Sequence, residues 1–431
     1  MENNFENQKD ELRNSLSTGG FGSESESAAD LEEVDEKVDN ALVQDFVSGF
    51  GSYKHSDYIA HVPGNILDSS NYSGYLRGIS REETEAFYVI DSAQTEHPVI
   101  GYIANEDSCV PGNLPSYGII ITRRSGELEC KTVDSEPVHI KRYDEQVKLF
   151  SRNSGLLESD WMLDKRAVII GCGSVGSFIA MQLARSGVGK FALCDTDILE
   201  IHNICRHQCG FDDLGRYKVD AVRDKILNIN PKADVTVFRS VIQRIPKETL
   251  TPLLGVDSII IGTGDNRESS RYACDNLAIP TNTPFVTTCC WTRAFAGEVI
   301  YWMPGKNLPC YQCSLGDLVD SEADSAPVEP NINYWGKRNE AETLSFEPGI
   351  AADIDFVSLV AVKIILDLIN RDNPNYTSRV INHLTQYTWV CNTNEVRIGG
   401  EKAGIFSHPL QITHNLRFRK KDGCPICGDK D

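Results

Sequence analysis

The sequence predicts an α/β protein built on a Rossmann-like, doubly wound, mostly parallel sheet, with a smaller N-terminal α+β domain and an acidic tail. Three observations support this fold class. A short apolar segment runs into the glycine-rich turn Gly171-Cys-Gly-Ser-Val-Gly176, as a strand does before a phosphate-binding helix. Strand-like and helix-like segments alternate over residues 141–300, which is typical of parallel strands joined by crossover helices. Two Cys-x-x-Cys pairs predict a metal site that ties the C-terminal strands to the core: Cys310/Cys313 and Cys424/Cys427.

The N-terminal segment is strongly acidic. Residues 1–40 contain twelve Asp or Glu and three Lys or Arg, and such a segment buries too little apolar surface to fold. We therefore expect residues 1–44 to form a disordered acidic tail. The whole chain of 431 residues has a net charge of −20, which disfavours binding to nucleic acid or to membrane surfaces.

Neither a signal peptide nor a membrane span is predicted. The longest apolar run, residues 356–369, contains Lys363 and Asp367 and is too short to cross a bilayer. The first residues are polar and lack the apolar stretch of a secretory signal. Fourteen cysteines in such a chain indicate a reducing compartment, so we expect a cytoplasmic protein whose paired cysteines bind metal.

Residues 45–140 are predicted to form the small α+β accessory domain. Two strand-like runs, 99–103 and 117–122, are separated by turn-forming residues. No catalytic constellation is visible in this segment of the sequence.

Residues 141–431 are predicted to form one large domain. Its first part alternates between two kinds of segment: strands at 167–170, 191–194, 235–238 and 258–261, and helices at 177–186 and 218–227. Residues 314–349 interrupt this alternation, because Asp, Glu, Pro, Ser and Asn dominate there without an apolar period. Such a stretch predicts a structureless functional loop or lid. The last expected elements are a helix at 355–370 and strands at 388–391 and 411–418.

The glycine-rich turn indicates a nucleotide site. Its glycines let the backbone approach a phosphate, and the N-terminus of the following helix attracts negative charge. Asp195 ends the second strand, nineteen residues after Gly176, and this spacing suits a carboxylate that binds ribose hydroxyls. These two features fit NAD and ATP equally well.

The polar residues that follow favour ATP. They are Asp197, the segment Asn203-Ile-Cys-Arg206, Lys218 in Gly215-Arg-Tyr-Lys218, and the pair Asp265-Asn266. Two spaced cations and a late carboxylate suit a triphosphate with its magnesium ion, since magnesium prefers one or two carboxylates plus phosphate oxygens. A nicotinamide-dependent dehydrogenase would leave these residues and the paired cysteines without a role.

Taken in order, these motifs resemble the ThiF/MoeB superfamily, which includes ubiquitin-activating enzymes. That family shows G-x-G-x-x-G, D-x-D, N-L-x-R-Q, G-x-x-K, a D-N pair and C-x-x-C, and matching elements span residues 166–427 here. The resemblance implies adenylation, in which the C-terminal carboxylate of a ubiquitin-like or sulfur-carrier protein attacks the α-phosphate of ATP and pyrophosphate leaves. It also implies a homodimer and, in conjugation pathways, a downstream conjugating enzyme as a partner.

The same resemblance implies roles for individual residues. Asp195 would hold ribose and Asp265 would bind Mg²⁺, while Arg206, Lys218 and Asp265 would act in catalysis by neutralising charge on the phosphates. The implied ATP site comprises Gly171, Gly173, Gly176, Asp195, Asp197, Asn203, Arg206, Lys218, Asp265 and Asn266. The four paired cysteines would form a closed tetrahedral Zn²⁺ site, which is structural because no position stays open for water.

One departure from the family concerns the crossover loop, residues 314–349, which contains no cysteine. Thioester-forming members carry one there, and alignment puts Glu340 near its position. Three interpretations stay open: the enzyme stops at the adenylate, a hydroxyl accepts the acyl group, or a cysteine from elsewhere accepts it. The hydroxyl candidates are Ser345, Thr343 and Ser325, and the substitute cysteines are Cys289 or Cys290, ahead of Cys205 and Cys209.

Two further departures lie within the motifs. His207 stands where the family has Gln, and the R-Y-x-R-Q segment appears as Arg142-Tyr-Asp-Glu145-Gln146. In homodimeric members the second arginine reaches the partner's ATP site, which Glu145 cannot do. Either Arg152 or Lys148 replaces that arginine, or the site works without one.

Two other functions stay open beside carrier activation. One is a peptide- or small-molecule-adenylating relative, which the missing loop cysteine favours. The other is an inactive scaffold subunit that pairs with a catalytic partner. Such subunits usually lose the phosphate clamp, whereas Arg206, Lys218 and Asp265 are all present here.

Overall fold

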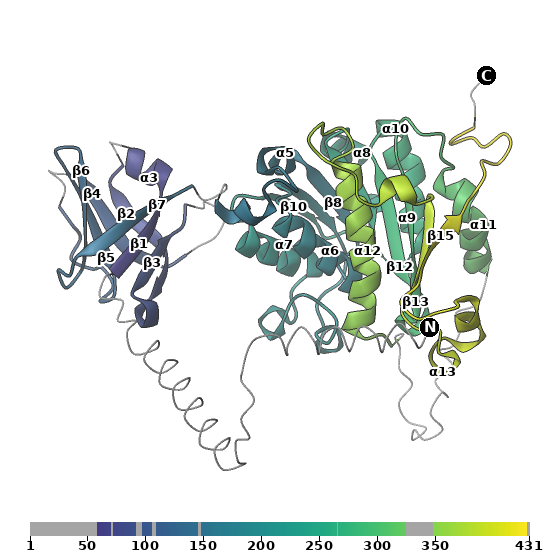
Figure 1. Ribbon diagram of the computed structural model, residues 1–431, viewed down its shortest axis with the longest axis horizontal. Helices are drawn as coiled ribbons and strands as arrows, with labels where there is room; N and C mark the ends of the chain where they lie inside the picture. Colours follow the sequence, from purple (N-terminus) through teal and green to yellow (C-terminus); the bar gives the residue numbers. More distant parts are fainter. Residues whose placement is uncertain are drawn as a thin grey trace, which may run out of the picture.

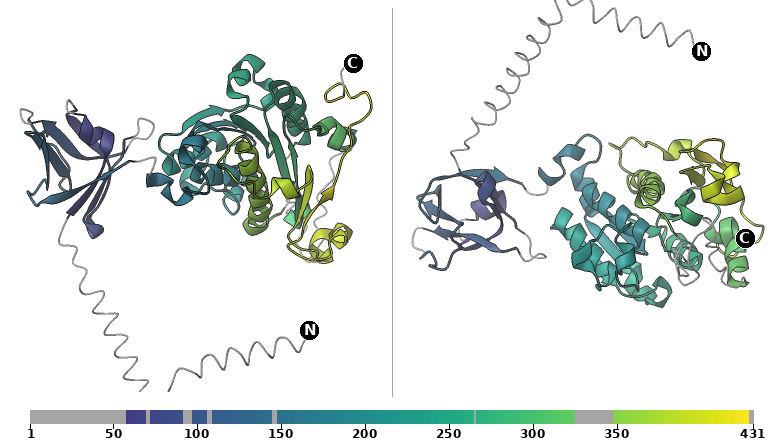
Figure 2. Two further views of the ribbon diagram at one scale, coloured as in Figure 1. Left: turned by 45° about the horizontal axis from the view of Figure 1, so that its top comes forward. Right: turned by 90° about the horizontal axis from the view of Figure 1, so that it is seen from below.

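A computed structural model describes residues 58–69, 72–91, 97–105, 109–144, 148–264, 266–324 and 348–428, with only the backbone given for 318–324. Its described strands form two sheets, one of seven strands and one of eight. The smaller sheet has an apolar core whose buried members lie between residues 60 and 138. The larger sheet has two apolar cores, one on each face, with buried members between residues 157 and 390. Figures 1 and 2 show the two sheets as distinct bodies.

The larger sheet has the strand order β10-β9-β8-β11-β12-β13-β14-β15. The first five strands in this order are parallel, and the last three are added antiparallel. The predicted mostly parallel sheet is therefore confirmed. The strands are β8 Arg166–Ile170, β9 Lys190–Cys194, β10 Asp234–Phe238, β11 Ser258–Gly262, β12 Phe285–Cys290, β13 Ala296–Trp302, β14 Tyr387–Cys391 and β15 Ile412–Leu416.

Helices cover both faces of this sheet (Figure 1). Alternate residues of the central strand β8 enter opposite cores, because successive side chains of a strand point to opposite faces. Ala167 and Ile169 join the core that includes α6, α7 and α12, whereas Val168 and Ile170 join the core that includes α8, the segment after α9, and α11. The helices are α5 Ser159–Asp164, α6 Ser174–Arg185, α7 Lys218–Ile229, α8 Lys247–Leu250, α9 Arg267–Tyr272, α10 Ile279–Thr281, α11 Tyr311–Asp324, α12 Ala351–Ile369 and α13 Val396–Gly399, with a π-helix at Ala273–Ala278.

Two predicted helices begin earlier than expected, and a further helix was not predicted. α6 begins at Ser174 and α12 at Ala351, three and four residues before the expected starts. The prediction that residues 314–349 are structureless is wrong for their first part, because α11 continues to Asp324. Its N-terminal turn packs Tyr311 and Leu315 into the core, and two apolar residues at this spacing did not form a visible period. No helix in the described ranges is long and apolar enough to cross a membrane.

The smaller sheet has the order β6-β5-β4-β2-β3-β1-β7. Its members are β1 Tyr58–Pro63, β2 Gly74–Arg81, β3 Ala86–Val89, β4 Val99–Asn105, β5 Ile119–Arg124, β6 Glu127–Thr132 and β7 Val138–Tyr143, with the short helix α3 Gly64–Asp68 between β1 and β2. Two of these strands, β4 and β5, correspond to the predicted runs. The described part of this unit therefore contains more β structure than the sequence predicted.

Candidate nucleotide site and cysteine cluster

The glycine-rich turn joins β8 to α6 at the carboxyl edge of the parallel strands, as predicted. Gly171 has φ +95°, and a Cβ there would lie 2.7 Å from the backbone N of Gly264. A Cβ on Gly176 would lie 1.9 Å from the carbonyl oxygen of Gly171. Packing alone therefore requires glycine at both positions. Gly173 is different, because no atom of the described residues lies within 4 Å of its Cβ position, and open space next to a helix N-terminus suits a phosphate group.

Asp195 lies beside this turn. Its Oδ2 accepts a hydrogen bond of 2.6 Å from the N–H of Cys172, and its Oδ1 accepts one of 2.8 Å from the N–H of Asp197. Two backbone donors thus orient the carboxylate. Each carboxylate oxygen has a further lone pair, so the arrangement can also accept the ribose hydroxyl bonds that the sequence predicted.

Lys218 is held in place before any ligand arrives. Its Nζ donates to Asp197 Oδ2 at 2.8 Å, and its backbone N–H donates to the carbonyl of Asp197 at 2.9 Å. The lysine side chain is only 11% exposed. Its hydrogen bond holds the pKa of Asp197 below the usual range, although partial burial opposes this shift. The first residue of α7 therefore presents an ordered cation next to Asp195.

The Asn203–Arg206 segment forms a tight turn on the same edge. The carbonyl of Asn203 accepts a 3.0 Å hydrogen bond from the N–H of Arg206, while the Asn203 side chain accepts one of 2.9 Å from the N–H of Glu200. The guanidinium of Arg206 reaches the start of α12, since a Cβ on Gly349 would lie 3.6 Å from Nη1. This arginine therefore stands beside the end of the predicted crossover loop.

The loop after β11 closes the site on the other side of the turn. Thr263 was missed by the sequence analysis, although it stands within the Gly262-Thr-Gly segment. Its hydroxyl donates to the carbonyls of Ile170 and Gly171 at 3.1 and 2.7 Å. Asn266 accepts the N–H of Glu268 at 2.8 Å and caps α9. Asp265, the predicted magnesium ligand, lies outside the described residues.

The predicted acyl acceptors differ in what the structure describes of them. Ser345, with Thr343, Ser325 and Glu340, lies outside the described residues. Cys289 is mostly buried and donates to Glu298 Oε1 at 3.4 Å. Burial and the negative charge of Glu298 raise the pKa of this thiol well above its usual range, and a thiol that stays protonated is a weak nucleophile.

The other three cysteines proposed as acyl acceptors differ in how far their side chains are exposed to solvent. Cys205 is exposed, and its thiol donates to the carbonyl of His202 at 3.5 Å. Cys209 is buried, and burial raises its pKa to about 12. Cys290 is partly buried and packs against the core under α6 and α12.

The segment Arg142-Tyr143 belongs to the smaller sheet. Both residues lie in β7, and the guanidinium of Arg142 binds the carboxylate of Asp68 through two hydrogen bonds, one of 2.6 Å. Glu145 and Gln146 lie outside the described residues. Lys148 and Arg152 are exposed.

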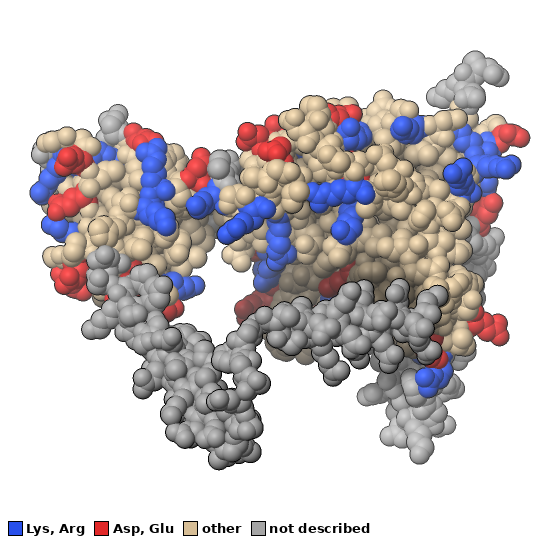
Figure 3. All heavy atoms as spheres, in the orientation of Figure 1, with Lys and Arg blue, Asp and Glu red and all other residues tan. Residues whose placement is uncertain are grey.

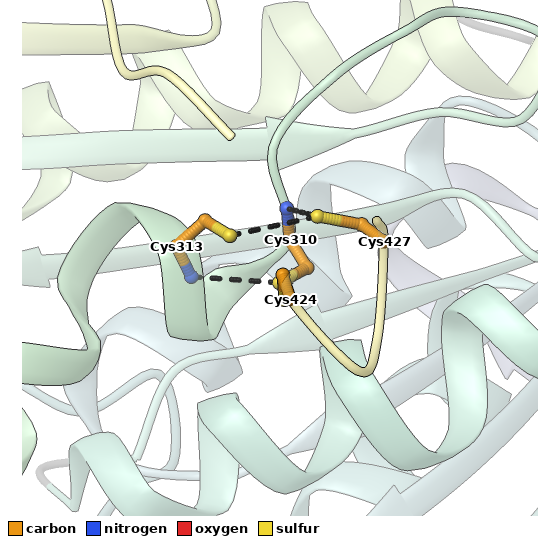
Figure 4. A group of neighbouring side chains, drawn as sticks. All are labelled: Cys310, Cys313, Cys424 and Cys427. Carbon is orange, nitrogen blue, oxygen red and sulfur yellow. Dashed lines mark hydrogen bonds between the residues drawn. The ribbon is translucent and has the colours of Figure 1, made fainter. Parts of the chain in front are cut away.

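The four paired cysteines converge, as predicted. Their sulfur atoms all lie within 4.8 Å of one another, and Figure 4 shows the side chains pointing toward a common centre. Cys310 Sγ lies 3.7 Å from Cys424 Sγ, and Cys313 Sγ lies 3.5 Å from Cys427 Sγ. Tetrahedral zinc with bonds of about 2.3 Å needs sulfur–sulfur distances of about 3.8 Å, so the donor set fits this ion.

The surroundings of the cluster also fit ionised sulfur. Backbone N–H groups of Cys313 and Lys421 donate to Cys310 Sγ and Cys313 Sγ at 3.4 and 3.3 Å. Asp275, which the sequence analysis missed, accepts the N–H groups of Tyr311 and Gln312 at 3.0 Å each and so orients the turn after Cys310. Burial raises the pKa of Cys310, so this thiol needs a cation beside it to ionise.

Comparisons with known proteins agree with this geometry. The family model described as "ThiF family" matches residues 143–399. Ubiquitin-like modifier-activating enzyme 5 of Caenorhabditis elegans is 26% identical over 250 residues, which cover 56% of this chain and 56% of that protein. The sulfur carrier protein ThiS adenylyltransferase of Escherichia coli K12 is 26% identical over 194 residues, 44% of this chain and 74% of that enzyme. This chain thus spans just over half the length of the worm relative.

Among solved structures, E. coli MccB with ATP has a TM-score of 0.45 and 17% identity, over 63% of this chain and 68% of that one. The family match carries the assignment, because it extends over more than half of the chain and contains the glycine-rich turn, Asp195 and Lys218. The chain belongs to the ThiF family.

Proposed function

We propose that this protein uses ATP to adenylate the C-terminal carboxylate of a ubiquitin-like or sulfur-carrier protein. The carboxylate attacks the α-phosphate, pyrophosphate leaves, and an acyl-adenylate remains. The observation that carries the proposal is the convergence of Gly173, Asp195 and a pre-positioned Lys218 on one sheet edge. Similarity to proteins named as adenylyltransferases and modifier-activating enzymes supports it.

The residues of the site have distinct roles in this reaction. Asp195 binds the ribose hydroxyls, and the phosphates lie along the turn at Gly173, where the N-terminus of α6 attracts negative charge. Asn203, Arg206 and Lys218 bind the phosphates, and the two cations offset the charge that builds up as pyrophosphate leaves. Asn266 follows on the other side of the turn, and a magnesium ion bound by Asp265 would screen the phosphates.

Three further assignments belong to the same proposal. A zinc ion held by the four cysteines supports the fold, a homodimer is the working unit, and the protein acts in the cytoplasm. The proposal extends as far as the acyl-adenylate, because the crossover loop carries no cysteine and burial raises the pKa of the Cys289 thiol. Transfer to a hydroxyl such as that of Ser345, or to the exposed thiol of Cys205, is an alternative end of the same reaction.

The geometry favours this function over the alternatives. An inactive scaffold has no need for an ordered cation, yet Lys218 is fixed by two contacts to Asp197. A nicotinamide enzyme needs no such cation beside the ribose carboxylate. Adenylation of a peptide would use the same residues and the same chemistry. Only the identity of the substrate therefore distinguishes a carrier-activating enzyme from a peptide-adenylating one.

The test measures pyrophosphate release from ATP and magnesium, with a small β-grasp carrier protein that ends in glycine as the substrate. We expect release that depends on this protein. Asp265→Asn and Lys218→Met should each lower the rate at least about a hundredfold, as loss of a charge-stabilising group does. Lys190→Met is the matched control, because Lys190 begins β9 at the opposite edge of the sheet from Asp195.

Calorimetry with ATP and with NAD precedes the rate measurement. Binding of NAD instead of ATP, or release that Asp265→Asn leaves unchanged, would exclude the proposal. Release with a short peptide but not with the β-grasp protein would transfer the same chemistry to a peptide substrate and contradict the carrier assignment.

A further inference from the structure

His207 lies between two parts of the nucleotide site. Its imidazole is buried, with 7% of the residue exposed. Nε2 lies 2.7 Å from the carbonyl oxygen of Cys172 in the glycine-rich turn, and Nδ1 accepts a 3.0 Å hydrogen bond from the N–H of Cys209. Because Nδ1 accepts, it carries no proton, and Nε2–H donates to Cys172. The ring is therefore neutral in this arrangement.

The backbone of His207 extends the connection to the phosphate-binding turn. Its N–H donates to the carbonyl of Asn203 at 3.0 Å, and the same carbonyl accepts the N–H of Arg206 at 3.0 Å. The N–H of Gln208 donates to the hydroxyl of Ser177 in α6 at 3.3 Å. One side chain thus joins the turn that faces the phosphates to the turn that carries Asn203 and Arg206.

We propose that His207 is a positioning residue that makes nucleotide binding depend on pH. The neutral imidazole holds the glycine-rich turn against the Asn203–Arg206 turn, and a protonated imidazole releases them and weakens binding of ATP. This inference rests on the proposed function, since it concerns the ATP site. The reason is geometric. A proton on Nδ1 would point at the N–H of Cys209, so two buried hydrogen-bond donors would face each other and the present hydrogen bond would be lost.

The groups around the ring act on its pKa in both directions. Burial lowers the pKa of His207 most, the hydrogen bond to the Cys172 carbonyl raises it, and Lys218 at the start of α7 lowers it. Asp195 at the end of β9 and Asp213 in the following turn raise it. The net shift is downward from 6.5. The thiols of Cys172 and Cys209 do not titrate in this range, because burial raises the pKa of each.

The sign of the effect follows from this shift. Above about pH 6.5 the ring is neutral in both the folded and the unfolded chain, and the turns are held together. Protonation of the folded ring sets in only as pH falls through its lowered pKa, which lies below 6.5, and the folded site must then give up the bond from Cys209. Binding of ATP should therefore weaken in acid.

The test is calorimetric titration of the full chain, zinc-loaded, with ATP and magnesium between about pH 4.5 and about pH 8, a range that extends well below the unfolded pKa of histidine. His207→Gln is the informative variant, because an amide carries one donor for Cys172 and one acceptor for Cys209 and does not titrate in this range. We expect the wild type to lose roughly tenfold in affinity over the range, the ratio that corresponds to about one hydrogen bond. The glutamine variant should lose clearly less.

Two other variants complete the set. His207→Ala should bind ATP roughly tenfold more weakly at about pH 8, where the glutamine variant restores most of this loss. His202→Gln is the matched control, because His202 lies in the same segment but is exposed and pairs with Glu200 at 3.3 Å. It should follow the wild-type curve. Protonation of ATP itself affects all variants equally, so differences between the curves report the histidine.

Identical pH dependence in the wild type and His207→Gln would overturn the inference while the proposed function stands. If the wild type bound no ATP at any pH, both would fail. Thermal unfolding of each variant at each pH separates loss of fold from loss of binding. Nitrogen NMR of the wild-type imidazole gives an independent readout: at neutral pH we expect the neutral Nε2–H form, and a doubly protonated ring would contradict the inference.

Discussion

At the scale of single residues, the glycine-rich turn separates packing from ligand binding. A Cβ on Gly171 or Gly176 would collide with backbone atoms of the protein itself, at 2.7 and 1.9 Å. Gly173 meets no such obstacle, and its φ of −75° is accessible to any residue. The space at Gly173 is therefore available to a ligand, and the turn keeps its shape through the other two positions.

We predict opposite effects for two alanine substitutions in this turn. Gly176→Ala should lower the free energy of unfolding by about 2 kcal/mol or more, since backbone must move. Gly173→Ala should change it by no more than about 0.5 kcal/mol but weaken ATP binding, because a methyl group would occupy the phosphate space. Chemical denaturation and calorimetry measure the two quantities, and undiminished ATP binding by Gly173→Ala would place the phosphates elsewhere.

At the scale of elements, α12 ends in a carboxylate that organises the following loop. Asp367 is 1% exposed and accepts hydrogen bonds from the hydroxyls of Tyr376 and Ser378 at 2.7 and 2.9 Å. It also accepts the backbone N–H groups of residues 379–381. Burial opposes the charge on this group, but the donors outweigh burial and hold the pKa of Asp367 below its usual range. The sequence analysis treated Asp367 only as a charge that excluded a membrane span.

Asp367→Asn should lower the free energy of unfolding at neutral pH by about 3 kcal/mol, because an amide cannot satisfy this set of donors. A lowered carboxyl pKa contributes stability above about pH 4, and this contribution is lost as pH falls through the folded value. The variant should therefore show less acid destabilisation than the wild type. Urea denaturation at several pH values measures this, with Asp372→Asn, at a side chain 67% exposed, as the control near wild type.

At the scale of the whole molecule, the cysteine cluster connects distant parts of the chain. It joins the start of α11 to a turn 114 residues later, beyond β15. Charge is distributed unevenly along the chain, since residues 1–40 contribute −9 (twelve acidic minus three basic) to the net −20. On the face shown in Figure 3, basic side chains lie across the middle of the molecule and acidic side chains mostly nearer its margins.

Removal of one cysteine ligand should loosen this connection. We expect Cys424→Ser to abolish stoichiometric zinc and to lower the free energy of unfolding by roughly 3 kcal/mol, because structural zinc contributes folding energy. Hydrogen exchange should rise near α11 and in residues 412–428, while β8 and β9 stay protected. Elemental analysis and exchange mass spectrometry test this, with the exposed Cys109→Ser as the control. Full zinc content in the Cys424 variant would contradict the assignment.

Several strands and helices of the larger domain were predictable because each is marked by a pattern within its own few residues. The strands around 167–170, 191–194 and 258–261 are short apolar runs, and the helix after Gly176 follows a glycine pattern that has few alternatives. α11 was missed because its packing residues are too few to form a period. In the smaller sheet, β1 and β7 were missed because they pair with segments far apart in the chain. β6 was missed although it follows β5 directly through Ser125-Gly126, a hairpin signal that the sequence analysis did not use.

The sequence by itself determined the first four strands of the larger domain, the glycine-rich turn and the four cysteine ligands, since these depend on local pattern and spacing, whereas β13 and α11 were seen only in the structure. Tertiary structure alone decided which groups meet: Lys218 with Asp197, His207 with Cys172, and Arg142 with Asp68. The physical reason is that hydrogen bonds and ion pairs between separate segments depend on how strands and helices pack. The helix and strand propensities of a segment do not reveal how that segment packs against others.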